Sequence, residues 1–256
     1  VLAKLSHPNI VEVITAGLTG DEMRLPYYVM ERLEGLNVRT VLEKKGAFDT
    51  ERAICIAIDL LDALAHAHDN GVIHRDVKPE NIFLHQSRNG TTVTKLLDFG
   101  IMRMMGGTGK ETGKFVGTLR YAAPEQLRGE ELGPACDLYA AGLVLYEMLA
   151  GRGPFDDEGD VHKVAMAAMK KDPPPVTKFA RVSPELGALV DSALKKSPAD
   201  RPKDAFTFAA ALRRMVTEKA RKPDETLVNE LAQLAKTAAG ESVVDQAAGF
   251  RTTMEI

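Results

Sequence analysis

The chain has 256 residues, of which 45% are hydrophobic and 27% are charged. This composition is typical of a globular protein and excludes a largely disordered chain. The 33 Lys and Arg and 36 Asp and Glu residues give a net charge of -3, so there is no overall basic charge of the kind that binds nucleic acid. The two cysteines, Cys55 and Cys136, form no CxxC pair, which argues against a zinc site or a disulfide framework.

The first residues of the chain are expected to form short β-strands. Branched and aromatic residues at 10–13 and 27–30 alternate with a period of two, and a turn sequence at 19–21 separates them. A long helix is predicted from Thr50, where apolar residues begin to recur at helical spacing. Asp49 or Thr50 can cap its first turn, and an Asn-Gly pair ends it.

A β-hairpin is predicted next. The runs 82–85 and 92–97 have strand character, and Asn-Gly at 89–90 lies between them. This dipeptide favours a type I′ turn, because both central residues of that turn need a positive φ. Between Gly100 and Gly117 the chain is rich in Gly, Thr and Lys, which is typical of a mobile loop.

After Pro134 the pattern is helical. Residues 138–149 are apolar on almost every side, so this helix is expected to be buried. A cap and a proline at 183–184 begin another helix, and residues 203–216 form a further one. The apolar run 139–149 falls short of the roughly 18 residues that a membrane helix needs. A β-rich start followed by helices indicates two lobes of unlike class.

Three short motifs follow one another in a fixed order. The segment from His74 to Asn81 reads H-R-D-x-x-x-x-N, residues 98–100 read Asp-Phe-Gly, and residues 123–125 read Ala-Pro-Glu. In this order they are the signature set of protein kinases. The chain therefore resembles a protein serine/threonine kinase, and is most similar to the bacterial eukaryotic-like (Hanks-type) group. The resemblance covers roughly residues 1–216.

The resemblance implies an α+β fold with the two lobes of a protein kinase. It implies an incomplete β-rich N-lobe and hinge over residues 1–34, a complete α-helical C-lobe over 35–216, and a tail or linker over 217–256. The implied activity is transfer of the γ-phosphoryl group of ATP to Ser and Thr hydroxyls of protein substrates, with ATP and Mg²⁺ as cofactors.

The resemblance implies that four residues carry the chemistry. Asp76 would accept the proton of the attacking hydroxyl, which as general-base catalysis contributes about 10²–10⁴ in rate. Lys78 would place a cation beside the transferring phosphoryl group. Asn81 and Asp98 would supply the hard oxygen ligands that Mg²⁺ prefers, and the hairpin between them would bring them together.

Residues 30–33 resemble the hinge between the lobes. By that match Met30 borders the back of the adenine pocket, and the backbone groups of Glu31 and Leu33 hydrogen-bond the adenine edge. Phe83 would form the floor of the same pocket.

Other matched residues would control or support the site. Thr118 would position the substrate. Arg75 implies control by phosphorylation of the loop, because an added phosphate can pair with an arginine. Thr112 is the first candidate for that phosphate and Thr108 the second.

Five residues are expected to have structural roles, and Arg75 is one of them. His74 would order the catalytic loop, and Asp137 lies on the buried helix that anchors this loop in the family. Arg201 would pair with Glu125 of the Ala-Pro-Glu motif.

The first part of the kinase signature, G-x-G-x-x-G-x-V and the strand lysine of V-A-I-K, is not found in the sequence. Val1 to Lys4 echo V-A-I-K, but Pro8 follows too soon for the helix that carries the partner glutamate. We expect both motifs to lie upstream of Val1. Since phosphoryl transfer needs the Lys–Glu pair as well as the metal aspartate, residues 1–256 alone should bind ATP weakly and show little or no kinase activity.

Two hypotheses remain open. The first is a catalytic kinase whose gene continues upstream, and the second is a pseudokinase-like regulatory or adaptor module. Retention of Asp76, Lys78, Asn81 and Asp98 favours the first. The expected partners are ATP and protein substrates and not nucleic acid, with self-association for trans-autophosphorylation as a further option. The expected location is cytoplasmic, with the cytoplasmic part of a longer membrane-anchored chain as the alternative.

Overall fold

The computed structural model describes residues 5–20, 26–87, 91–98 and 118–217. The strands are β1 (Val13–Leu18), β2 (Pro26–Met30), β3 (Gly35–Asn37), β4 (Ile82–Gln86) and β5 (Thr92–Leu96). The helices are α1 (Val38–Lys45), α2 (Thr50–Asp69), α4 (Pro124–Arg128), α5 (Ala135–Ala150), α6 (Val161–Lys170), α7 (Pro184–Ala193) and α8 (Ala205–Arg213). Short 3-10 turns lie at Pro79–Asn81, Thr118–Tyr121, Asp156–Glu158, Val176–Lys178 and Pro198–Asp200.

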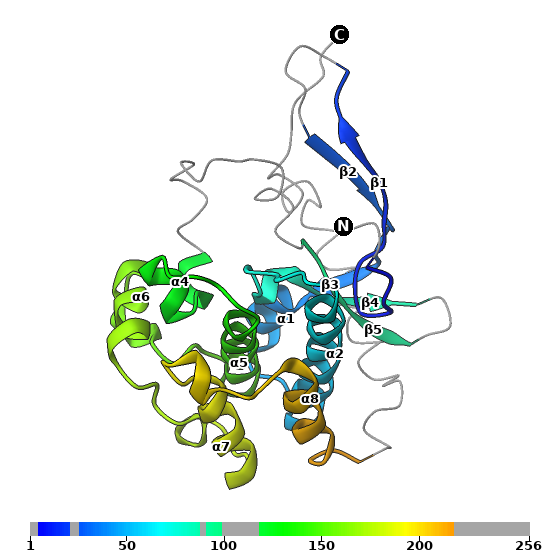
Figure 1. The fold of residues 1–256 in the computed structure, drawn as a ribbon. Coiled ribbons are helices and arrows are strands. Elements are labelled where there is room, and N and C mark those ends of the chain that lie inside the picture. The colour runs from blue at the N-terminus through cyan, green and yellow to red at the C-terminus, as the bar shows by residue number, and fades with distance from the viewer. Residues whose placement is uncertain (1–4, 21–25, 88–90, 99–117, 218–256) are drawn as a thin grey trace.

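A small β part and a larger helical part follow one another along the chain. Strands β1 and β2 pair antiparallel and project from one end as a two-stranded ribbon, while β3, β4 and β5 form a second antiparallel sheet beside the helices (Figure 1). This order of β and α elements agrees with the sequence pattern.

The segment that precedes β1 lies against strand β5. The Leu96 amide donates to the Asn9 carbonyl (2.8 Å), and the Val11 amide donates to the Leu96 carbonyl (3.0 Å). The predicted start of the strand at residue 10 is therefore wrong. Ile10 makes a single parallel bridge to Leu96, and the paired strand begins at Val13. Ile10 and Val11 are buried there, so the apolar pattern reflects docking on β5.

The two strands of the predicted hairpin are confirmed. β4 and β5 pair from Ile82 opposite Leu96 to Gln86 opposite Thr92. Its Asn-Gly turn at 89–90 lies outside the described residues, as do the whole of the predicted loop and residues 218–256 of the predicted tail.

The core of the helical part lies where α2 packs against α5 and α8 (Figure 1). α2 covers residues 50–69 and its N-cap Asp49 accepts a hydrogen bond from the Arg52 amide, as the sequence predicts. α5 is buried almost throughout, which explains its apolar residues on every side. A Cβ atom on Gly142 would lie 2.8 Å from the Ala193 Cβ, so the glycine allows α7 to pack directly on α5.

The sequence patterns did not predict α1. Its eight residues are too short to show a clear apolar period, although its Asn37 N-cap accepts a hydrogen bond from the Thr40 amide (2.8 Å) and Gly46 ends it at φ 78°. Both are ordinary helix-end signals. α1 follows β3, the short strand that comes after the expected hinge.

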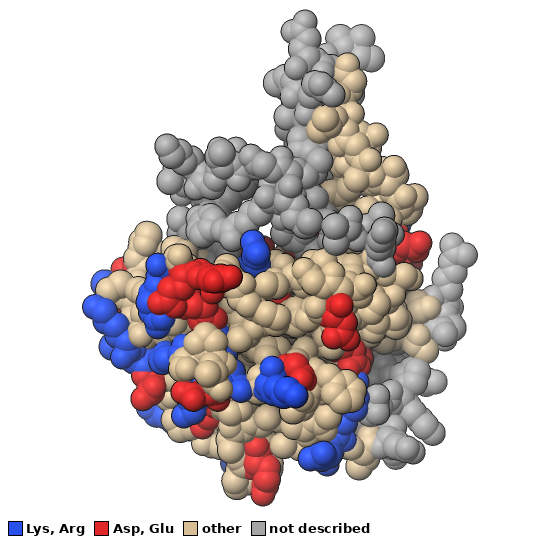
Figure 2. Space-filling model, viewed as in Figure 1, with Lys and Arg blue, Asp and Glu red and all other residues tan. Residues whose placement is uncertain are grey.

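Charged side chains of both signs lie next to each other over the helical part (Figure 2). Within the ranges described above, no helix combines the length and the apolar character needed to cross a membrane.

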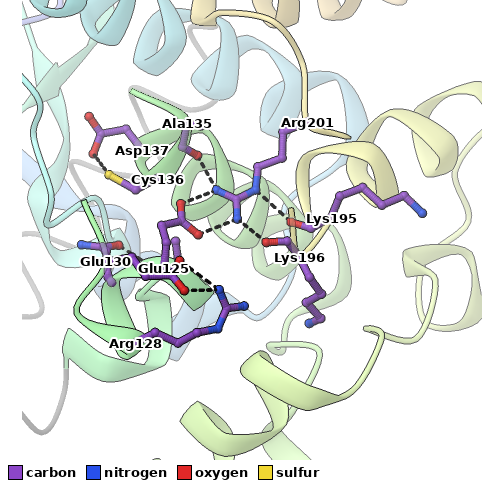
Figure 3. Close-up of polar contacts among 11 residues, drawn as sticks. Glu125, Arg128, Glu130, Ala135, Cys136, Asp137, Lys195, Lys196 and Arg201 are labelled. Atoms are coloured by element: carbon purple, nitrogen blue, oxygen red, sulfur yellow. Dashed lines mark hydrogen bonds and ion pairs between the residues drawn. The ribbon is translucent and has the colours of Figure 1, made fainter. Parts of the chain in front are cut away.

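A buried ion pair joins α4 to the segment before α8 (Figure 3). The Arg201 guanidinium donates to both carboxylate oxygens of Glu125 at 2.6 and 2.7 Å, and their side chains are 0% and 4% exposed. Its remaining N–H groups donate to the carbonyls of Ala135, Lys195 and Lys196. All five guanidinium donors are thus used, which is what a buried arginine needs.

Replacing Arg201 by Met should lower the free energy of unfolding by about 3–5 kcal/mol, because the Glu125 carboxylate would remain buried without its cation. The matched control is Arg128→Met, since Arg128 pairs with Glu130 at side-chain exposures of 39% and 49%. An exposed pair of this kind is worth at most about 1 kcal/mol. Urea unfolding of both variants measures the difference. An equal loss of unfolding free energy in both would show that the buried pair stabilises the fold no more than the exposed one.

Candidate active site

One buried carboxylate holds the loop between α2 and β4. Asp137, in the first turn of α5, is 1% exposed. Its carboxylate accepts hydrogen bonds from the amides of His74 and Arg75 and contacts Nε2 of His68, each at 2.8 Å. Because the donors come from the loop and from the last turn of α2, the carboxylate fixes the loop against two helices. The sequence patterns gave His68 no such part.

Arg75 has a backbone conformation that residues other than glycine rarely adopt. Its φ is 66°, in the left-handed region, which costs about 1–2 kcal/mol for a non-glycine residue. Its amide donates to Asp137, and its carbonyl accepts a hydrogen bond from Nε2 of Gln126 in α4 (3.0 Å). These two bonds offset the strain and connect the loop to the helix that begins in the Ala-Pro-Glu motif. The Arg75 side chain itself is exposed.

His74 joins the loop to the end of β5. It is fully buried, and its Nδ1 accepts a hydrogen bond from the Asp76 amide (3.2 Å). The network therefore assigns the ring hydrogen to Nε2, which donates to the Leu97 carbonyl (2.8 Å). His74 thus connects the backbone of Asp76 to the residue immediately before Asp98.

The Asp76 side chain is held through one oxygen. Its Oδ2 accepts hydrogen bonds from Lys78 Nζ (2.7 Å) and Asn81 Nδ2 (3.2 Å), and Asn81 Nδ2 also donates to the Asp76 carbonyl (2.9 Å). Its Oδ1 is buried and has no hydrogen-bond partner among the described residues. A carboxylate fixed in this way has one oxygen in place to accept a proton.

Asn81 and Asp98 lie at the two ends of the β4–β5 hairpin. The Leu97 amide donates to the Asn81 carbonyl (2.8 Å), which closes the hairpin beside both residues. Since Nδ2 of Asn81 donates to Asp76, Oδ1 is the atom that Asn81 would offer to a cation. The Asp98 carboxylate accepts a hydrogen bond from the Tyr28 hydroxyl of β2. Burial, and then the bond to Asp98, raises the pKa of Tyr28.

This donor set fits Mg²⁺. Mg²⁺ usually binds through one or two carboxylates together with substrate phosphates and water, not in a cage made wholly of protein. No group of three or more His, Cys, Asp or Glu residues gathers as a metal cage in the described part of the chain. The amide oxygen of Asn81 and the carboxylate of Asp98 are the hard oxygen donors that such a site needs.

The expected hinge lies between β2 and β3. The Glu31 amide donates to the Glu12 carbonyl (2.9 Å), so the Glu31 carbonyl is the backbone group left for a ligand. The Glu31 carboxylate accepts a hydrogen bond from Lys95 Nζ of β5 (2.7 Å). Burial acts in the opposite direction, but the bonds from Lys95 and Glu12 keep the pKa of Glu31 below its usual value.

The other predicted pocket residues occupy neighbouring elements. Met30 ends β2 and is 39% exposed, whereas Leu33 and Phe83 are half-buried, Leu33 in the hinge and Phe83 in β4. Thr118 begins the turn Thr118–Tyr121, and its side chain lies outside the described part. The two predicted phosphorylation sites, Thr108 and Thr112, also lie outside it.

A second polar network was not predicted; Tyr121 and Glu147 are buried in it, whereas Arg39 and Glu80 are partly exposed. Arg39 of α1 donates from Nε to Glu80 (3.0 Å) and from Nη1 to Glu147 of α5 (2.8 Å), and it also contacts the Tyr121 hydroxyl. That hydroxyl donates to Glu147 (2.5 Å), and burial, then the Glu147 charge, raises the pKa of Tyr121. Glu147 was the available signal, because a buried charge in an apolar helix requires a partner.

The chain is similar to known proteins over most of its length. The sequence model of the protein kinase domain matches residues 1–244. The serine/threonine-protein kinase PknB of Mycobacterium tuberculosis is 36% identical over 244 residues, which are 93% of this chain and 38% of that protein. The serine/threonine-protein kinase pkn3 of Myxococcus xanthus is 37% identical over 227 residues, 86% of this chain and 41% of that protein. The chain therefore spans about two fifths of the length of these relatives.

A solved structure confirms the expected fold. The kinase domain of Mycobacterium tuberculosis PknI superposes with a TM-score of 0.65 at 25% sequence identity, over 84% of this chain and 75% of that one. The two-lobed α+β fold implied by the resemblance is thus confirmed. With a family match over nearly its whole length and bacterial serine/threonine kinases among its relatives, the chain belongs to the protein kinase family.

Proposed function

We propose that the chain provides the catalytic loop and the metal ligands of a serine/threonine protein kinase, which transfers the γ-phosphoryl group of ATP to protein Ser and Thr hydroxyls. The observation that carries the proposal is the Asp76 carboxylate, with Oδ2 held by Lys78 and Asn81 and Oδ1 buried without a partner among the described residues. The division into residues 1–34, 35–216 and 217–256 belongs to the same proposal.

Asp76 acts as the general base in this proposal. Its Oδ1 accepts the proton of the substrate hydroxyl as that oxygen attacks phosphorus. Lys78, 2.7 Å from Oδ2, keeps the carboxylate in place and puts a positive charge beside the transferring group. Because little covalent chemistry is left to the protein in phosphoryl transfer, positioning and charge account for most of the effect.

Asn81 and Asp98 would hold Mg²⁺ at the open end of the hairpin, and the cation would bind the ATP phosphates there. When bound, Mg²⁺ neutralises the negative charge that the phosphates carry and develop. The adenine lies against Met30 and Phe83, with the Glu31 carbonyl and the Leu33 backbone as its hydrogen-bond partners. The support for this placement is that the Glu31 amide is already used by Glu12, which leaves the carbonyl.

Regulation by loop phosphorylation is part of the proposal. The backbone of Arg75 is fixed by Asp137 while its side chain is exposed, so the guanidinium can pair with a phosphate on Thr112 or, as second choice, Thr108. Self-association would allow one copy to phosphorylate another. Thr118 positions the substrate hydroxyl.

We also propose a cytoplasmic location for this part of the protein. Cys55 and Cys136 form no disulfide in the described part of the chain, which suits a reducing compartment.

Replacing Asp76 by Asn should lower kcat for phosphoryl transfer by about 10²–10⁴, because the amide cannot accept the proton. The shape of the side chain is preserved, so KM for ATP should not change. The assay measures transfer from radiolabelled ATP to a protein substrate. It uses the protein as its gene encodes it.

Asp191→Asn is the matched control. Asp191 lies on α7 and also has one buried carboxylate oxygen without a partner among the described residues, so its replacement should leave kcat unchanged. An Asp76→Asn protein that transfers phosphate at the wild-type rate would contradict the proposal. Nucleotide binding without any transfer by the wild-type protein would instead support a regulatory, pseudokinase-like module.

A further inference from the structure

The Tyr28 hydroxyl reaches from the β1–β2 ribbon to Asp98. Tyr28 lies in the middle of β2, where it pairs with Ala16 of β1, and its hydroxyl donates a hydrogen bond to Asp98 Oδ1. Seventy positions separate the two residues in the sequence. The contact therefore connects the small β part of the molecule to the residue that we assign as a metal ligand.

Asp98 is a residue whose side chain needs such a contact. Its φ is 51°, in the left-handed region, and the residue is exposed. The backbone is held as far as Leu97, whose amide donates to Asn81 and whose carbonyl accepts from His74. These bonds fix where the chain leaves β5, but they do not set the direction of the Asp98 carboxylate. Among the described residues, the bond from Tyr28 is the one that does.

Contacts of β2 with its neighbouring strands fix the position of Tyr28. Three residues further on, the Glu31 carboxylate accepts a hydrogen bond from Lys95 Nζ of β5 (2.7 Å), which ties the end of β2 to the hairpin. Successive residues of a strand point to opposite faces, so Tyr27 and Tyr28 differ in what they contact. The Tyr27 ring lies against Gly17 of β1, whereas the Tyr28 hydroxyl reaches Asp98.

We propose that Tyr28 is a positioning residue for Asp98, whose carboxylate it orients toward the bound divalent cation. The inference rests on the proposed function, because it takes Asp98 as a metal ligand. A carboxylate has about four lone-pair sites, so one hydrogen bond to Oδ1 leaves Oδ2 fully available to a cation. Loss of an outer hydrogen bond to a metal ligand typically weakens metal affinity by about 10–100-fold.

The test uses Mn²⁺ as the probe, in the presence of ADP, on the protein as its gene encodes it. Free Mn²⁺ is measured by electron paramagnetic resonance during titration of the wild type, Tyr28→Phe, Tyr27→Phe and Asp98→Asn. Tyr28→Phe removes only the hydroxyl, and we expect it to weaken Mn²⁺ binding by roughly 10-fold or more. Tyr27→Phe removes the same group from the opposite face of β2 and should bind Mn²⁺ like the wild type. Thermal unfolding without metal checks that both variants fold.

The outcomes separate the inference from the proposed function. If Asp98→Asn weakens Mn²⁺ binding and Tyr28→Phe does not, the positioning role of Tyr28 is wrong and the proposed function stands. If Tyr28→Phe and Tyr27→Phe weaken it equally, the effect belongs to the ribbon as a whole and the inference is again overturned. If Asp98→Asn leaves Mn²⁺ binding unchanged, Asp98 is not a ligand and both proposals fail.

Discussion

The site depends first on the Asp137 carboxylate. Buried at the start of α5, it accepts the amides of His74 and Arg75 and contacts the His68 ring. A charge placed there needs these partners, because a buried carboxylate without hydrogen bonds is costly. It also lies in the first turn of a helix, where the helix dipole favours negative charge. Through His74 the same constraint reaches the Asp76 amide and the residue before Asp98.

α5 supports the site from both of its ends. Near its C-terminal end Glu147 contacts Arg39 and Tyr121, which tie it to α1 and to the turn that precedes α4. Arg39 also holds Glu80, in the turn immediately before Asn81. The apolar residues between Asp137 and Glu147 are buried, so α5 is held in the core and fixes the positions of both carboxylates. The loop between α2 and β4, helix α1 and the turn before α4 are therefore all held by α5.

The sequence predicted those features that have a local or motif-based signal. The α2 and α5 helices have clear apolar patterns, and the catalytic loop and hairpin follow from short motifs. Contacts between residues 70 to 108 positions apart leave no such trace, which is why the bonds of Tyr28 to Asp98 and of Arg39 to Glu147 were missed. Glu147 alone gave a hint, as a charge in an apolar helix. α1 was too short to show an apolar period. The apolar pattern at 10–13 was taken for a strand, although its first residues are a segment docked on β5.

The most direct test of this account is amide hydrogen exchange in Asp137→Asn. The substituted amide keeps the shape of the side chain, but its NH₂ group must face one of the donors that the carboxylate accepts. We expect faster exchange at His74 and Arg75 than in the wild type, with protection in the middle of α2 and α5 unchanged. Unaltered exchange at His74 and Arg75 would contradict it, since the loop would then be held by something other than the Asp137 carboxylate.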